Sequence, residues 1–99
     1  MGKLTEAQIA DGLARLRGWT REGEAIRKQF TFPSFPDAIA FVDRLAVDAE
    51  AADHHPDILI NYTRVTLTYS THSDGGLTAK DMAGAANADA LAARMATQA

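Results

Sequence analysis

The sequence predicts one α+β domain with the element order α-β-β-α-β-β-α, in which a small antiparallel sheet carries helices on one face. Three observations lead to this prediction. Helix-start motifs occur three times, pairs of β-rich segments lie between them, and 99 residues leave room for a single domain, 1–99. Because so short a chain buries only about 60–70% of its unfolded surface, we also expect it to self-associate.

The first helix and the first hairpin follow one another directly. Thr5 and Gln8 have the spacing of a capping box, so the helix should begin at Glu6, and Gly18 supplies its stop. A tight turn then separates two short strands. The second strand, 25–32, places its core side chains on one face, with a lysine interrupting them: Ile26, Lys28, Phe30 and Phe32.

A second helix begins near Ser34. Serine serves as its cap, Pro36 lies in the first turn and Asp37 supplies an early acid. This helix should extend to about Ala52, and its apolar face is the widest in the chain. Either the helix is simply well buried, or it also packs against another subunit. Its apolar positions are Ile39, Phe41, Val42, Leu45, Ala46, Ala49 and Ala52.

The next two strands form the best-defined hairpin of the sequence. Pro56 takes His55 out of the helical region, so the second helix should finish near Asp53. Residues 58–62 and 65–71 are rich in β-branched and aromatic side chains. Only two residues separate the two segments, which predicts an antiparallel hairpin.

The third helix follows a loop at 72–76 that ends in Gly75-Gly76. Thr78 and Asp81 have the spacing of a capping box, and an alanine-rich run carries the helix almost to the end of the chain. Capping alone accounts for Asp81 in the sequence. The glycine pair belongs to no G-x-G-x-x-G or Walker pattern, so we expect no phosphate-binding loop.

Composition excludes several classes of function. With 13 Asp and Glu against 10 Lys and Arg, the formal charge is −3, and the basic residues form no run. Nucleic acid and an anionic membrane surface are therefore not expected as partners. The absence of cysteine removes disulfides, thiolate nucleophiles and cysteine-ligated zinc. No segment has the length of a membrane span or of a secretory leader, so we expect a cytoplasmic protein.

The three histidines carry the chemical argument. His54 and His55 lie between the second helix and the second hairpin, and His72 follows the last strand of that hairpin. The start of one strand and the end of its antiparallel neighbour are adjacent in space, so the three histidines should converge on one pocket at the edge of the sheet. Histidine gives or takes protons near neutral pH, and the pattern therefore predicts an acid/base site.

The residues around the histidines leave alternatives open. Glu50 precedes His54 by one helical turn, so it either orients that imidazole or is an ordinary surface acid. Asp53 either accepts a hydrogen bond from a ligand or ends the helix. A zinc site is the main chemical rival, but no H-E-x-x-H or H-x₃₋₅-H motif is present, and adjacent histidines diverge in extended chain. No serine has the context of a nucleophile elbow.

Three motifs stand out in the second half of the chain: an E-x-x-D-H-H-P block, a T-H pair after the hairpin, and a G-L-T-x-x-D helix start. Their residues are Glu50, Asp53, His54, His55, Pro56, Thr71, His72, Gly76, Leu77, Thr78 and Asp81. The Gly18-Trp19 pair and the overall length complete a pattern that resembles the pterin-4a-carbinolamine dehydratases. The resemblance covers essentially the whole domain.

The resemblance implies a four-stranded antiparallel sheet backed by helices and assembled as a homodimer or homotetramer. It implies no metal and no cofactor, because the pterin is the substrate. The implied enzyme is a hydro-lyase of tetrahydrobiopterin recycling. Its substrate, 4a-hydroxytetrahydropterin, is the product of aromatic amino acid hydroxylases and loses water to give quinonoid dihydropterin.

Carried over residue by residue, the resemblance makes His54, His55 and His72 the catalytic histidines. We expect His54 and His72 to handle the two protons and His55 mainly to hold the substrate. The chain departs from animal members of the family at Ile58, where they carry tryptophan, so an aromatic wall of the pocket is absent or supplied elsewhere. The implied pterin site contains Asp53, Pro56, Thr71, Ser73 and Asp74, with Glu50 and Asp81 in support.

A non-enzymatic role is the alternative. The family also serves as a dimerisation cofactor for a homeodomain transcription factor, and such a coactivator would bind its partner through the long second helix rather than through the histidines. Retention of all three histidines favours the enzyme. The preferred pterin side chain, the choice between dimer and tetramer, and the acid and base among the histidines stay open.

Overall fold

The predicted order of elements is the observed one. The structure is a computed structural model that describes residues 2–97. Its elements are α1 (Glu6–Ala14), β1 (Thr20–Glu22), β2 (Ala25–Thr31), α2 (Phe35–Ala52), β3 (Asp57–Asn61), β4 (Arg64–Tyr69), the short 3₁₀ helix η1 (His72–Asp74) and α3 (Ala79–Thr97). Among the described residues, no helix is both long and apolar enough to cross a membrane.

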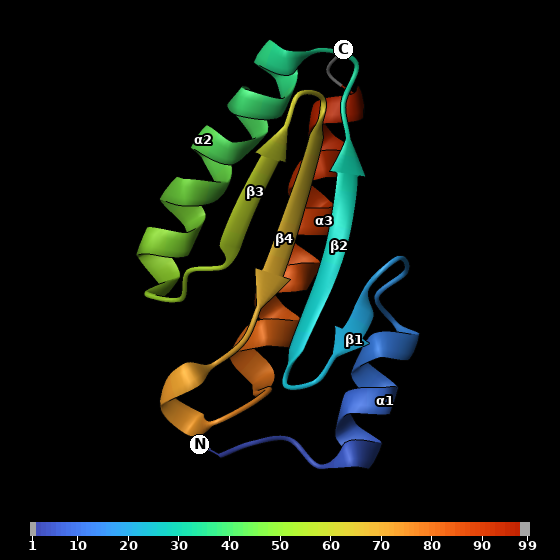
Figure 1. Ribbon diagram of the computed structural model, residues 1–99, viewed down its shortest axis with the longest axis vertical. Helices are drawn as coiled ribbons and strands as arrows, with labels where there is room; N and C mark the ends of the chain where they lie inside the picture. The colour runs from blue at the N-terminus through green and yellow to red at the C-terminus, as the bar shows by residue number, and fades with distance from the viewer. Residues whose placement is uncertain (1, 98–99) are drawn as a thin grey trace.

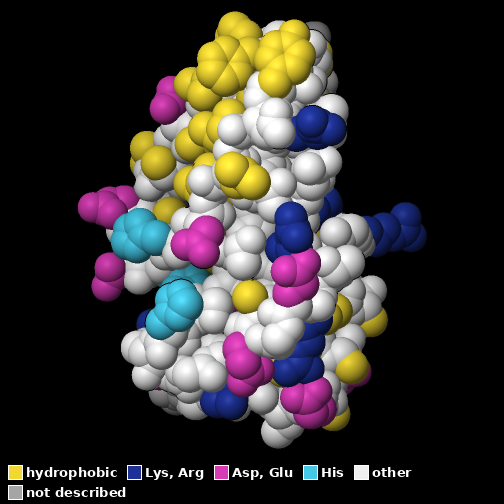
Figure 2. Space-filling model, viewed as in Figure 1, with side chains coloured by type: hydrophobic (Ala, Val, Ile, Leu, Met, Phe, Trp, Pro, Cys, Tyr) yellow, Lys and Arg dark blue, Asp and Glu magenta, His cyan; other side chains and the backbone are white. Residues whose placement is uncertain are grey.

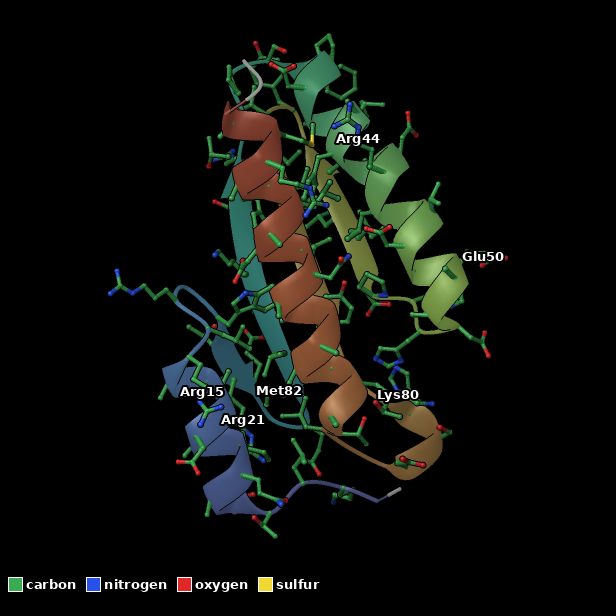
Figure 3. The ribbon with its side chains drawn as sticks, turned by 180° about the vertical axis from the view of Figure 1, so that it is seen from behind. Arg15, Arg21, Arg44, Glu50, Lys80 and Met82 are labelled. Atoms are coloured by element: carbon green, nitrogen blue, oxygen red, sulfur yellow. The ribbon has the colours of Figure 1, made fainter. Side chains whose placement is uncertain are left out.

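The four strands form one antiparallel sheet in the order β1-β2-β4-β3. Figures 1 and 3 show that the helices lie on one face of this sheet, with α3 crossing behind β2 and β4 and α2 running along β3. The α+β fold class with helices on one face is thus confirmed. β1 and β3 are the edge strands, and β3 has every residue exposed.

Local caps explain where the helices begin. The Thr5 hydroxyl accepts from the Gln8 amide at 3.1 Å, and the Gln8 side chain accepts from the Thr5 amide at 2.9 Å, as the capping box predicts. Ser34 caps α2 through the Asp37 amide at 3.2 Å. Each cap satisfies backbone donors that the first helical turn leaves without partners.

The lysine that interrupts the core face of β2 has a partner in α3. Lys28 Nζ donates to Asp89 Oδ1 at 2.8 Å and to the Arg17 carbonyl at 2.9 Å. The Trp19 indole N–H donates to the same Asp89 carboxylate at 3.1 Å. A half-buried charge at this position is therefore paired and hydrogen-bonded, and it ties α3 to the sheet.

The second hairpin begins one residue earlier than predicted, and its last strand ends two residues earlier. The strands are Asp57–Asn61 and Arg64–Tyr69, so the turn falls on Tyr62 and Thr63. Tyr62 adopts a left-handed backbone with φ of 56°, which a tight two-residue turn requires. β4 ends before Thr71 because Thr71 pairs with Gly76 in an isolated bridge that closes the following loop.

Candidate active site

The histidine-bearing loops lie side by side at one end of the second hairpin. Asp57 of β3 pairs with Thr68 of β4, so the loop before β3 and the loop after β4 leave the sheet together. Figure 2 shows the histidine side chains gathered in one region of this face of the molecule. The antiparallel pairing therefore brings together residues that are separated in the sequence, as predicted.

The histidines border several separate cavities rather than one. His55 and His72 line a cavity of about 330 Å³ at the edge of the sheet. His54 lines a second cavity of about 470 Å³ between α2 and α3. This corrects the expectation of a single pocket. Successive side chains of an extended segment point in opposite directions, and a carboxylate of α3 holds the His54 ring on the helix side.

His54 is the best-anchored of the three histidines. Its Nε2 lies 2.7 Å from Oδ1 of Asp81, whose side chain is completely buried. Its ring stacks on Tyr69 with 6.0 Å between ring centroids and 24° between ring planes. The imidazole is thus fixed by one hydrogen bond in its plane and one aromatic contact on its face.

His55, not His54, is the partner of Glu50. His55 Nε2 lies 2.7 Å from Glu50 Oε1, and both side chains are largely exposed. The helical-turn argument for a Glu50–His54 pair is wrong because α2 ends one residue too early. Asp53 takes a left-handed backbone (φ 51°, ψ 42°), so His54 has already left the helix. Figure 3 shows Glu50 pointing away from α3.

Asp81 does more than cap α3. Its Oδ2 accepts from the Thr78 amide at 2.9 Å, which is the predicted capping contact, and also from the Thr71 hydroxyl at 2.8 Å. Its Oδ1 faces His54. Capping alone therefore does not account for this residue. The carboxylate joins the loop before β3, the loop after β4 and the start of α3.

The remaining predicted site residues fall into two groups. Thr71 and Pro56 are buried, and the Thr71 hydroxyl is occupied by Asp81 and by Thr78 at 2.8 Å. Thr71 therefore contacts the site from its buried side, through its hydrogen bond to Asp81. Ser73 and Asp74 lie exposed in η1, and Asp53 is exposed at the end of α2. Asp53 ends the helix, and these three side chains are accessible from solvent.

Glu24 is a site residue that the sequence pattern did not single out. It lines the His55–His72 cavity from the β1–β2 turn, and its backbone carbonyl accepts from the Ser70 hydroxyl at 2.8 Å. Hydrogen bonds from Lys3 and then Arg21 lower the pKa of Glu24. The β1–β2 turn reaches the site because β2 pairs with β4, and no local sequence motif predicts the register of that pairing.

Tyr69 was also missed, because alternation along β4 assigns it only to the core. It lines the α2–α3 cavity beside His54 and Lys80. Its hydroxyl has no hydrogen-bond partner among residues 2–97. Burial, followed by the charges of Asp48 and Asp81, raises the pKa of Tyr69 to about 12. The phenol therefore keeps its proton at alkaline pH values at which an exposed tyrosine loses it.

Ile58 lines a shallow third cavity, of about 570 Å³, with His55, Pro56 and Val47. Among the described residues that line this cavity there is no Phe, Tyr or Trp, so no such ring takes the place of a tryptophan at position 58 there. Within residues 2–97, no three histidine or acidic side chains come together in a cluster that could hold a metal ion.

The sheet and the one-sided helices define the chain as a small α+β domain that carries two histidine–carboxylate pairs at one end of its second hairpin. A model of the family described as "Pterin 4 alpha carbinolamine dehydratase" matches residues 2–91. The chain belongs to this family.

Relatives and solved structures agree with that assignment. A protein of Roseiflexus castenholzii, provisionally named a pterin-4-alpha-carbinolamine dehydratase, is 56% identical over 88 residues, which cover 89% of this chain and 95% of that protein. A Mycobacteroides abscessus protein with the same provisional name is 53% identical over 83 residues, 84% of this chain and 88% of its own.

Two solved structures share the fold. A "transcriptional coactivator/pterin dehydratase" from Brucella melitensis superposes with a TM-score of 0.89 at 38% identity, covering 92% of this chain and 99% of that one. A pterin dehydratase-like protein identified as a RuBisCO assembly factor in the alpha-carboxysome superposes with a TM-score of 0.67 at 33% identity, covering 77% and 90%. The fold thus occurs in proteins described by different roles, so a function for this chain has to be argued from its histidine site.

Proposed function

We propose that this protein dehydrates 4a-hydroxytetrahydropterin to quinonoid dihydropterin, as a step in tetrahydrobiopterin recycling. The pterin is the substrate, and neither a metal nor a cofactor takes part. One observation carries the proposal: all three histidines of the chain stand around the ends of β3 and β4, next to two cavities large enough for a small heterocycle.

The reaction needs two proton transfers and nothing else. The C4a–O bond breaks, the hydroxide takes a proton from a general acid and leaves as water, and the N5 proton passes to a general base as the C4a–N5 double bond forms. Imidazoles suit both tasks near neutral pH, and each well-placed acid or base accelerates its step by about 10²–10⁴-fold. We assign the two transfers to His54 and His72, and the holding of the substrate mainly to His55. Because His54 lines the α2–α3 cavity and His72 lines the cavity at the edge of the sheet, this assignment requires the pterin to bind where it reaches both side chains.

A stopped-flow assay with chemically generated 4a-carbinolamine tests this function. The wild-type protein should accelerate dehydration, and His54→Ala and His72→Ala should each lose about 10²-fold or more in kcat. His55→Ala should act mainly on KM. A His72→Ala variant that keeps the wild-type rate would refute the assignment. Stoichiometric zinc in purified protein, with loss of activity on chelation, would favour a metal enzyme instead.

We also propose that the protein is a homo-oligomer, because its largest exposed apolar side chains lie together. Figure 2 shows them over α2 and β3. They are Phe35, Val47, Ile58, Leu59, Ile60 and Tyr62. β3 is an edge strand with free backbone groups along one side, so a second copy can extend the sheet there and cover the same apolar side chains.

Light scattering with Leu59→Asp tests the self-association. The wild-type chain should form dimers or tetramers, and the exposed Leu59→Asp variant should shift toward the monomer while it stays folded. A wild-type monomer at all concentrations would refute the proposal. Retained turnover in a surface variant that loses a foreign partner would instead support the coactivator alternative.

A further inference from the structure

The buried hydrogen bonds around Asp81 form a chain with a fixed direction. The Lys80 amide donates to the Thr78 hydroxyl at 3.2 Å, the Thr78 hydroxyl donates to Thr71, and the Thr71 hydroxyl donates to Asp81 Oδ2. The direction follows because the single hydroxyl proton of Thr71 goes to the Asp81 carboxylate, so the contact between the two hydroxyls has to use the proton of Thr78. Oδ2 also accepts the Thr78 amide. Every partner on this side of Asp81 is a donor.

The other carboxylate oxygen of Asp81, Oδ1, has His54 as its partner. His54 Nε2 lies 2.7 Å from Oδ1, in an environment where Asp81 is completely buried and His54 nearly so. An ionised carboxylate can only accept, so this short contact requires a proton on Nε2. In the neutral ring the lone pair is then on Nδ1, which has no hydrogen-bond partner among residues 2–97.

We infer that Asp81 is a positioning residue that holds His54 in the Nε2–H tautomer, so that Nδ1 is the nitrogen that exchanges a proton with the substrate. The inference rests on the proposed function for its catalytic part. It applies to either direction of transfer, because Nε2 stays engaged with Asp81 whether His54 acts as acid or as base. Nδ1 is the only ring nitrogen left to face a ligand.

The variant Asp81→Asn inverts this arrangement without changing the size of the side chain. Its carbonyl oxygen has to accept the Thr78 amide and the Thr71 hydroxyl, because an amide NH₂ in that place would meet two donors. The NH₂ group then faces His54 and donates to Nε2. The neutral imidazole has to carry its proton on Nδ1, and the nitrogen meant for proton exchange loses its lone pair.

Nitrogen NMR of ¹⁵N-histidine-labelled protein reads the tautomer directly, at a pH high enough for the ring to be neutral. We expect His54 of the wild-type protein to carry its proton on Nε2 and Asp81→Asn to carry it on Nδ1. The wild-type measurement needs no variant and no substrate, so it tests the tautomer whether or not the protein proves to be a dehydratase. A wild-type ring with its proton on Nδ1 would overturn the inference.

Kinetics test the catalytic part. In the carbinolamine assay, Asp81→Asn should lower kcat by about 10²-fold or more while KM stays within about threefold, because the ring is in place but in the wrong protonation pattern. Unchanged kcat in a folded Asp81→Asn protein with inverted tautomer would show that Nδ1 is not the exchanging atom.

Thr78→Val is the matched control. It removes a hydroxyl from the same buried network, keeps the β-branched shape, and leaves the backbone donor to Asp81 and the Asp81–His54 contact intact. This variant should be less stable, yet keep the wild-type tautomer and kcat. If it lost kcat as Asp81→Asn does, general damage to the network would explain both effects and the positioning role would fall.

Discussion

Two histidine–carboxylate pairs of equal length stand side by side in this protein. His54 Nε2 and Asp81 Oδ1 are 2.7 Å apart, as are His55 Nε2 and Glu50 Oε1. Their surroundings differ completely. The side chains of the first pair are 12% and 0% exposed, whereas those of the second are 55% and 82% exposed.

The comparison teaches that distance alone does not set the value of an ion pair. Water screens the exposed pair, and two mobile side chains lose entropy to hold one geometry, so such pairs contribute about 0–1 kcal/mol. The buried pair has no water to replace a lost partner. Removing Asp81 leaves the Thr78 amide, the Thr71 hydroxyl and His54 without their acceptor.

The largest effect should come from Asp81→Ala. Each buried donor left unsatisfied costs about 1–3 kcal/mol, so we expect the free energy of unfolding to fall by about 3–4 kcal/mol in urea denaturation. Asp43→Ala, on the exposed side of α2, is the control and should change stability by less than about 0.5 kcal/mol. A loss below about 1 kcal/mol for Asp81→Ala would erase the distinction between the two pairs.

The elements around both pairs could be predicted because their signals are local. Thr5 and Gln8 cap α1, and Ser34 caps α2, where the sequence placed them. The hairpin that juxtaposes the histidines needed only two β-rich segments and a short gap. Such features depend on a few neighbouring residues, and tertiary contacts did not override them.

The side-chain partners could not be predicted because one backbone angle decides them. A helix that continued past Asp53 would have put Glu50 one turn from His54, on the same face. The left-handed conformation at Asp53 turns the chain instead, and Glu50 contacts His55. The sequence pattern predicts Asp81 as the cap of α3, but it predicts no partner for the second carboxylate oxygen. Its contact with His54 spans 27 residues, and no periodicity encodes it.

An intermediate effect should appear at high pH, on the buried side of the comparison. The folded pKa of Tyr69, about 12, lies above its ordinary value of 10.0 because of burial and the nearby charges of Asp48 and Asp81. Between pH 10 and 12 the unfolded chain releases the phenol proton while the folded chain retains it. The stability that Tyr69 contributes is therefore intact below pH 10 and is lost as the pH rises toward 12.

The loss should reach at most about 2–3 kcal/mol, and Tyr69→Phe should lack it while keeping the ring that stacks on His54. Urea denaturation of both proteins at pH 9 and pH 11.5 measures the difference. All other titratable groups are the same in the two proteins, so the comparison isolates the contribution of the Tyr69 hydroxyl. Parallel losses in the wild-type protein and in Tyr69→Phe would contradict the raised pKa.

The smallest effect should come from Glu50→Gln. The Gln oxygen can still accept from His55, and the charge that is removed stands in water, so stability should change by no more than about 0.5 kcal/mol. High salt should reduce even this difference, because it screens the exposed charges. Urea denaturation at low and high salt measures the change in the free energy of unfolding, which can be compared directly with the change measured for Asp81→Ala. A loss above about 1 kcal/mol for Glu50→Gln would mean that the exposed pair is held by contacts beyond its two side chains, since solvent screening alone leaves so little energy to lose.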